Sequence, residues 1–161
     1  MNEAFVMRDL LIEEIGTAVR TTIKLFAKIG QEDWVYRPHP NTRTLNELAI
    51  HLALVPATDL AILQEQPEAS IRRIEHALAG ASDAKTLSDA MESGLEALKQ
   101  YMFSLDAETL LTKSTKPFYL DHAATQAKWL VEITTHVHHH RAQLFQYLKQ
   151  LGYPVSMFDL Y

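Results

Sequence analysis

Histidine is the residue type that stands out in this chain, which has eight histidines and no cysteine among its 161 residues. Four of them lie in one short segment, His136-Val137-His138-His139-His140. Neutral imidazole nitrogens bind divalent transition metals, so the segment indicates either a metal site or a polar helix face. It is not typical of an expression tag, because tags are uninterrupted and terminal, whereas 21 residues follow His140.

Helical spacing divides the four histidines into two pairs. Each residue of an α-helix turns by about 100°, so His136 falls about 40° from His140. His138 falls about 160° away, on the far side, and His139 about 100° away, on a flank. The apolar stripe of this segment surrounds the direction of His140 and consists of Trp129, Ile133, Leu144, Tyr147 and Leu151. Because such a stripe faces the core, we expect His136 and His140 to point inward.

Two inward histidines one helical turn apart can both reach a single metal ion. Without a partner, each buried imidazole would leave a donor and an acceptor unsatisfied, which is costly. Hydrogen bonds to other core groups are the alternative explanation for such a pair. We favour metal binding by His136 and His140, which then calls for a third ligand from elsewhere in the chain.

His51 is the available third nitrogen ligand. It lies in a predicted second helix, beside an apolar stripe that falls between about 40° and 100° from it and consists of Leu48, Leu52 and Val55. Glu47 lies one turn earlier, on the polar side of His51. Three neutral nitrogen ligands suit zinc, nickel, cobalt or iron(II) better than calcium or magnesium, which prefer oxygen. Three protein ligands also leave a coordination position open, which is typical of catalytic metal sites.

The other three histidines are weaker candidates. His39 lies between prolines in a loop, and His76 follows several charged residues, so we expect both at the surface. His122 is placed in the first turn of the last predicted helix, roughly 20 Å along its axis from the His136–His140 pair. We therefore do not expect His122 to be a ligand.

Apolar residues recur at helical spacing through most of the chain, glycine is scarce and strand-like alternation is absent, which favours an all-α protein. A capping box, Thr44 to Glu47, starts the second helix, and Pro56 is expected to kink or break it. Gly152, followed by Pro154, is expected to end the last helix. The predicted helices are 2–29, one from 45, a short one between Pro67 and Gly80, 86–105 and 121–151. We expect one helical turn after Gln31, an irregular segment 106–120, and a tail 155–161 that packs back on the body.

These elements predict an up-and-down four-helix bundle with an extra short helix, in a single domain that spans residues 1–161. The formal net charge of -5 gives no cationic surface for nucleic acid, so we expect no nucleic-acid partner. No uninterrupted apolar run approaches the roughly 20 residues of a membrane span, and the first nine residues do not resemble a signal peptide. We therefore expect a cytoplasmic protein with no membrane partner.

The last helix also resembles a known family motif. His136-x-x-His139-His140-Arg141-Ala142-Gln143, followed by Leu-Gly-x-Pro, is similar to the HxxHHRGQ signature of DinB/YfiT-like proteins, the DNA-damage-inducible family and not the polymerase of the same name. Segments 34–40 and 45–51 resemble the loop and second-helix start of that family. Ala142 stands where the family has glycine. The resemblance implies a four-helix bundle, often a homodimer, with a divalent metal ion bound by His51, His136 and His140.

The resemblance further implies an activity, because characterised relatives include S-transferases that use bacillithiol or mycothiol. A bound ion acidifies a thiol or a water and so creates an anionic nucleophile near neutral pH. We predict a metal-dependent transferase that activates a low-molecular-weight thiol cosubstrate, or a hydrolase that activates a water. Zinc or nickel is the expected metal, with iron, cobalt and manganese as alternatives. Glu47 is a candidate base or orienting partner, and Arg141 and Gln143 are candidates to orient a ligand or to lie in a dimer contact.

Three possibilities stay open. The chain is either an enzyme or a non-catalytic metal-binding or stress-related interaction protein, and a bundle without a metal is the third possibility. An outward patch on the last helix, Val131, His138 and Phe145, suggests a subunit contact and hence a homodimer. Because both enzymes and binding proteins dimerise, this patch does not separate the two classes.

Overall fold

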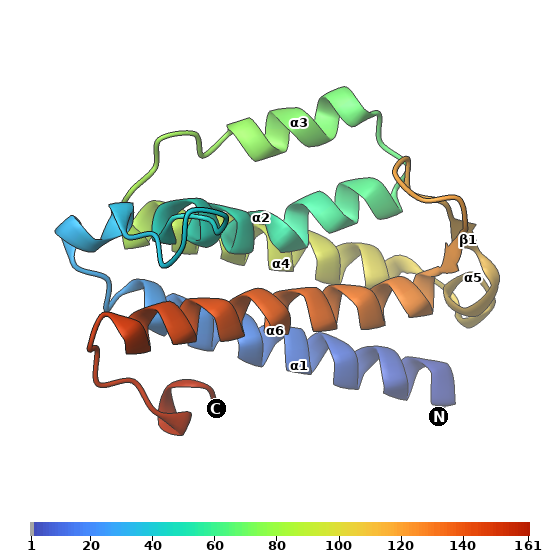
Figure 1. Ribbon diagram of the computed structural model, residues 1–161. Coiled ribbons are helices and arrows are strands. Elements are labelled where there is room, and N and C mark those ends of the chain that lie inside the picture. Colours follow the sequence, from blue (N-terminus) through green and yellow to red (C-terminus); the bar gives the residue numbers. More distant parts are fainter. Residues whose placement is uncertain (1) are drawn as a thin grey trace.

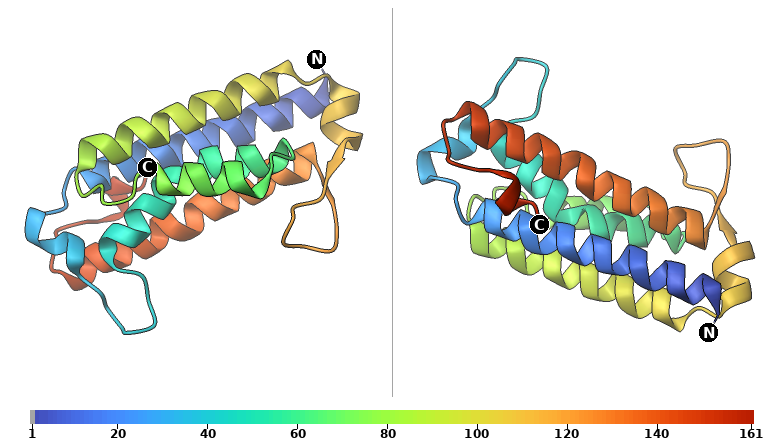
Figure 2. Two further views of the ribbon diagram at one scale, coloured as in Figure 1. Left: turned by 90° about the horizontal axis from the view of Figure 1, so that it is seen from above. Right: turned by 90° about the horizontal axis from the view of Figure 1, so that it is seen from below.

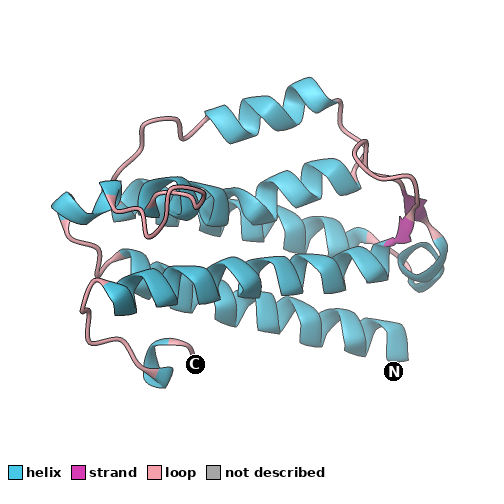
Figure 3. Cartoon of the chain, in the orientation of Figure 1, coloured by secondary structure: helices cyan, strands magenta, loops and turns pink. Residues whose placement is uncertain are grey.

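The computed structural model of the protein describes residues 2–161 (Figure 1). Its helices and strands are α1 Glu3–Phe26, η1 Gln31–Val35, α2 Leu45–Leu63, α3 Glu68–His76, α4 Ala84–Ser104, α5 Ala107–Thr112, β1 Ser114–Thr115, β2 Ala124–Thr125, α6 Gln126–Gln150 and η2 Met157–Asp159. Helices dominate the chain, as Figure 3 shows. The predicted all-α four-helix bundle with one extra short helix is confirmed.

The four long helices are arranged so that each packs against two others. α1 packs against α4 and α6 on one side of the bundle, and α2 packs against the same two helices on the other side (Figure 2). The four helices therefore surround a common core. α3 runs back along α2, so α2 and α4 point in the same direction (Figure 1). The buried apolar side chains of all four helices fill the space between them, among them Ile15, Phe26, Leu52, Leu98 and Leu144. This arrangement brings one face of α2 against one face of α6.

Side-chain caps fix where the long helices begin. Asn2, Thr44, Asp83 and Thr125 each accept a hydrogen bond from a backbone N–H of the first turn of their helix, which satisfies a donor that the helix itself leaves free. The predicted capping box is confirmed, because Glu47 also accepts from the Thr44 N–H at 2.7 Å. The last helix ends as predicted, with Gly152 in the left-handed conformation at φ +85°.

The segment before α6 differs from the expectation. Residues 106–120 contain the short helix α5 and the strand β1, which pairs with β2 in an antiparallel ribbon. This pairing takes up residues 124 and 125, so α6 begins at Gln126 and not at residue 121. His122 consequently lies in the loop between the strands and not in the first turn of a helix. α1 also stops early, at Phe26, because Lys28 and Ile29 donate to carbonyls three residues back and tighten the last turn.

α2 carries the most buried residues and is continuous. Pro56 lies inside it and does not end it, so of the expected kink or break, the break is wrong. Gly94 of α4 lets the two helices approach there, since a Cβ at this position would meet the Ala57 nitrogen at 3.0 Å. Among residues 2–161, α2 is also the one helix long and apolar enough to cross a membrane, although His51 and Asp59 interrupt its apolar run. Of that window, 67% is buried inside the bundle, as expected of a core helix.

The C-terminal tail packs back on the bundle, as predicted. Val155 is buried, and Asp159 forms an ion pair with Lys28 at 3.2 Å. The buried Arg141 of α6 donates to the Leu160 carbonyl at 3.0 Å and to the Thr21 hydroxyl at 2.8 Å. Arg141 therefore ties the tail and α1 to α6.

Candidate metal centre

Three histidines from two helices converge in the middle of the bundle. His51 projects from α2, and His136 and His140 project from α6, one turn apart. One ring nitrogen from each lies within 4.8 Å of the other two. The Nε2 atoms of His51 and His140 are 2.9 Å apart. We call these three residues the histidine cluster.

Hydrogen bonds on the outer nitrogens orient two of the three rings. Nδ1 of His136 lies 2.8 Å from Oδ2 of Asp59, and Nδ1 of His140 lies 2.8 Å from Oε1 of Gln143. Because both oxygens are acceptors, each Nδ1 carries the proton, and the lone pair of each ring is left on Nε2. The two Nε2 lone pairs therefore remain available inside the cluster.

Asp59 is the functional residue that sequence reasoning missed. It lies on α2, is only 7% exposed, and is the acidic residue that reaches the cluster. The sequence signal for it is a charged residue in the otherwise uncharged run from Leu52 to Leu63, because an aspartate is rarely buried without a partner. Gln143, which the sequence analysis named as a candidate to orient a ligand, contacts His140.

Burial keeps two of the rings neutral. Burial, followed by the positive charge of Arg43, lowers the pKa of His51 to about 3. Burial also lowers the pKa of His140 to about 4, while the hydrogen bond that its ring donates to Gln143 acts in the opposite direction. His140 is only 6% exposed. Both imidazoles are therefore neutral at pH 7, which is the form that binds a metal ion.

The spacing of the nitrogens fits a first-row transition metal. Two nitrogens on one tetrahedral zinc ion lie about 3.3 Å apart, given zinc–nitrogen distances of about 2.0–2.1 Å. The observed 2.9 Å between two of the nitrogens and the 4.8 Å limit for the set bracket this value. The spacing is therefore compatible with all three nitrogens on one ion.

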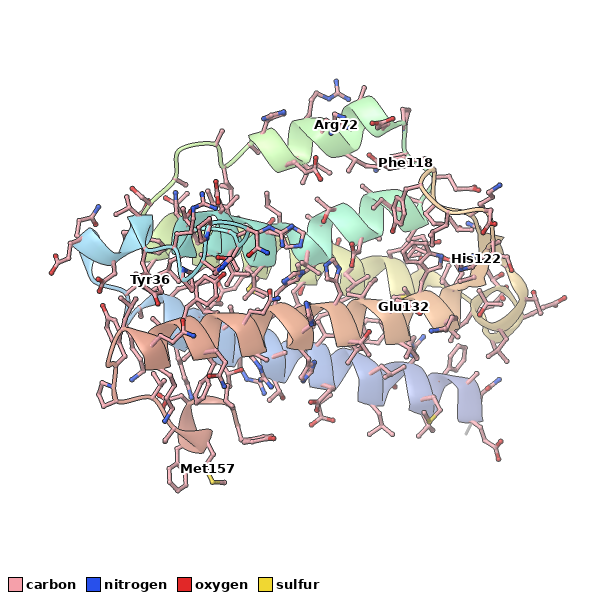
Figure 4. All side chains as sticks on the ribbon, in the orientation of Figure 1. Tyr36, Arg72, Phe118, His122, Glu132 and Met157 are labelled. Carbon is pink, nitrogen blue, oxygen red and sulfur yellow. The ribbon has the colours of Figure 1, made fainter. Side chains whose placement is uncertain are left out.

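Two cavities flank the cluster. The large cavity, of about 550 Å³, lies between α6 and the loop 117–124 and has Asp59 and His136 in its wall. The small cavity, of about 250 Å³, lies between α2 and α3 and has His51 and Glu47 in its wall. His122 and Glu132 line the large cavity and lie at the same end of the bundle (Figure 4). A small molecule in either cavity would lie next to a residue of the histidine cluster.

Glu47 does not take part in the cluster. Its carboxylate accepts from the Thr44 N–H and forms an ion pair with Arg37 at 3.1 Å. The backbone hydrogen bond from Thr44 is the main cause that lowers its pKa. Because both of these contacts stabilise the helix start, Asp59 and not Glu47 is the carboxylate that orients an imidazole. A role for Glu47 as a base stays a prediction.

The remaining histidines lie outside the cluster. The sequence predicted that His138 faces solvent on the far side of α6, and this is wrong. The side chain points to α1, with Nε2 3.0 Å from Oε1 of Glu14. The reason is that α6 packs against both α1 and α2, so its buried arc is wider than its apolar stripe. His139 is exposed and packs on the His140 ring, with 4.8 Å between centroids. His39 and His76 are exposed, as expected.

Known proteins share this bundle. The fold and the inward histidines define an all-α protein with a candidate three-histidine metal centre. The sequence model of the DinB family matches residues 1–161, and the chain belongs to this family. The family resemblance noted from the sequence is thereby confirmed.

Solved structures resemble the fold over nearly the whole chain. A candidate member of the DinB family from Exiguobacterium sibiricum 255-15 is 29% identical, with a TM-score of 0.79, and the match covers 96% of this chain and 97% of that one. DinB-like proteins from Bacillus subtilis (16% identity, TM-score 0.67, 91% and 94% covered) and Bacillus cereus ATCC 10987 (19%, 0.68, 91% and 93%) share the fold. No curated protein matches the chain.

Proposed function

We propose that the histidine cluster binds one divalent metal ion through the Nε2 atoms of His136 and His140 and a ring nitrogen of His51. The convergence of three imidazoles from two helices is the observation that carries this proposal. All three donors are nitrogen, so zinc or nickel is the expected ion, with iron, cobalt and manganese as alternatives. Asp59 and Gln143 would hold the rings of His136 and His140 in the binding tautomer.

The bound ion would supply Lewis acidity, which lowers the pKa of a thiol or water and creates an anionic nucleophile near neutral pH. Three protein ligands leave room for such a reactant, and the large cavity beside His136 gives space for its partner. We therefore propose a metal-dependent transferase that activates a low-molecular-weight thiol or a water. The absence of cysteine fits this proposal, because the thiol would come from the cosubstrate.

Metal content tests the first half of the proposal. The protein is purified without a nickel column, its metals are measured by mass spectrometry, and the metal-free form is titrated calorimetrically with zinc and nickel. We expect one ion per chain. Binding with the same affinity to a variant that lacks both His136 and His140 would contradict the proposed ligands.

Conjugation assays test the second half. The metal-loaded protein is incubated with bacillithiol, mycothiol or other small thiols and an electrophile, and loss of free thiol is followed. We expect turnover that disappears in the His140→Ala variant. Metal binding without turnover for any thiol, water or metal would favour the alternative, a non-catalytic metal-binding or interaction protein.

We also propose that the protein is a cytoplasmic homodimer. Exposed apolar side chains on α1 and α6, namely Val6, Met7, Leu10 and Val131, support a subunit contact. The patch of Val131, His138 and Phe145 that the sequence predicted is smaller than expected, because His138 forms a hydrogen bond with Glu14 and is not available for a subunit contact. Light scattering coupled to size-exclusion chromatography measures the mass, and a monomer at micromolar concentration would contradict the proposal.

A further inference from the structure

The large cavity has an unusual balance of charge. Among residues 2–161, its lining includes the carboxylates of Asp59 and Glu132 but no lysine or arginine. Glu132 pairs with Lys128, one turn earlier on α6, and Lys128 does not line the cavity. The Glu132 side chain is half exposed, so its carboxylate can also contact a second cation.

Aromatic rings form part of the same wall. Trp129 is buried, and its indole N–H donates to the Thr115 carbonyl at 3.3 Å, which leaves the ring as an apolar surface. Tyr119 comes from the loop opposite α6. Burial, and then the charges of Asp59 and Glu132, raise the pKa of the Tyr119 hydroxyl. Carboxylates beside aromatic rings favour organic cations, through Coulomb attraction and cation–π contact.

We infer that the large cavity binds an organic cation with an apolar body, such as an amine or a quaternary ammonium compound. The cationic group lies at Glu132 and Asp59, and the apolar body lies against Tyr119 and Trp129. An anionic compound would meet two carboxylates and no lysine or arginine in the cavity lining, which disfavours it. The inference rests on the proposed function in one respect: it names the charge class of the molecule on which the metal centre acts.

The test uses metal-free full-length protein and three probes of similar size. Benzyltrimethylammonium is a permanent cation without a lone pair for a metal, benzyl alcohol is neutral, and phenylacetate is an anion. Nuclear magnetic resonance follows the indole N–H signals of the two tryptophans during each titration. We expect the cation to bind about tenfold tighter than the alcohol, the anion to bind weakest, and the signal of Trp129 to move while that of Trp34 stays.

Two matched variants locate the bound cation. Glu132→Gln is expected to weaken binding of benzyltrimethylammonium about fivefold, the order expected for one half-exposed charge pair. Glu75→Gln removes a carboxylate from the wall of the small cavity and is expected to leave binding unchanged. Tyr119→Leu, which keeps an apolar side chain but removes the ring, is also expected to weaken binding.

Three results would overturn the inference: phenylacetate binding as tightly as the cation, no effect of Glu132→Gln, or a larger effect of Glu75→Gln than of Glu132→Gln. Because no metal is present, failure of the proposed metal site leaves this test intact. Conversely, if the protein binds zinc but not benzyltrimethylammonium, the inference about the cavity is wrong and the proposed metal site is unaffected.

Discussion

Replacing Asp59 by alanine removes the carboxylate that holds Nδ1 of His136 at 2.8 Å. The ring then loses the partner that keeps its proton on Nδ1, so the Nε2 lone pair is available for only part of the time. Removal of such an orienting group typically weakens metal affinity by about 10- to 100-fold, or about 1.4–2.8 kcal/mol. Asp59→Asn keeps an oxygen acceptor at the same place and is expected to lose less.

Calorimetric titration of zinc into EDTA-treated protein measures these affinities directly. At a fixed free zinc concentration, the same loss lowers the stability of the Asp59→Ala variant relative to the loaded native protein, by about 3–10 °C in melting temperature for a chain of this size. Asp89→Ala is the matched control, because Asp89 is exposed on α4 and contacts Lys85. An affinity for Asp59→Ala within twofold of the native value, while His136→Ala loses binding, would refute the orienting role.

Three further predictions concern the cluster itself. His140→Ala is expected to lower metal affinity at least about tenfold, whereas His138→Ala leaves it nearly unchanged; equal losses in a calorimetric titration would contradict the ligand assignment. Removing the metal with a chelator is expected to lower the melting temperature measured by circular dichroism, since a ligand of the folded state alone adds about 2.7 kcal/mol at 100 times its Kd. Metal-free protein is expected to lose stability as pH falls from about 6.5 towards 4, because unfolded histidine takes up a proton near 6.5, whereas His51 and His140 stay neutral in the fold down to about 3 and 4. The unfolded state therefore binds more protons in this window. A urea concentration at the unfolding midpoint that does not change between pH 6.5 and pH 4 would contradict the lowered pKa values of His51 and His140.

Most of the helical architecture follows from local sequence signals. Apolar residues at helical spacing, the Thr44 cap and the Gly152 end are short-range features, and the structure has all three. The predicted start of the last helix, residue 121, lies five residues before the observed start at Gln126, where Thr125 is the cap. Only the pairing of β1 with β2, a contact between distant residues, decides for Thr125.

The candidate site was predictable in part for the same reason. The inward direction of His136 and His140 follows from the angular position of both residues on one helix. The position of His138 does not, because it depends on a second neighbour, α1, which widens the buried arc of α6. Asp59 was missed because its partner, His136, is 77 residues away, and no local pattern links the two.

The wide separation of the cluster along the chain has a consequence for a protein without disulfides. His51 and His140 are 89 residues apart, and α3, α4 and α5 lie between them. An ion shared by both would act as a reversible staple, closing a long loop that the unfolded chain leaves free. Its escape would then accompany the separation of α2 from α6, so a colorimetric chelator in the buffer would report the rate at which the bundle comes apart.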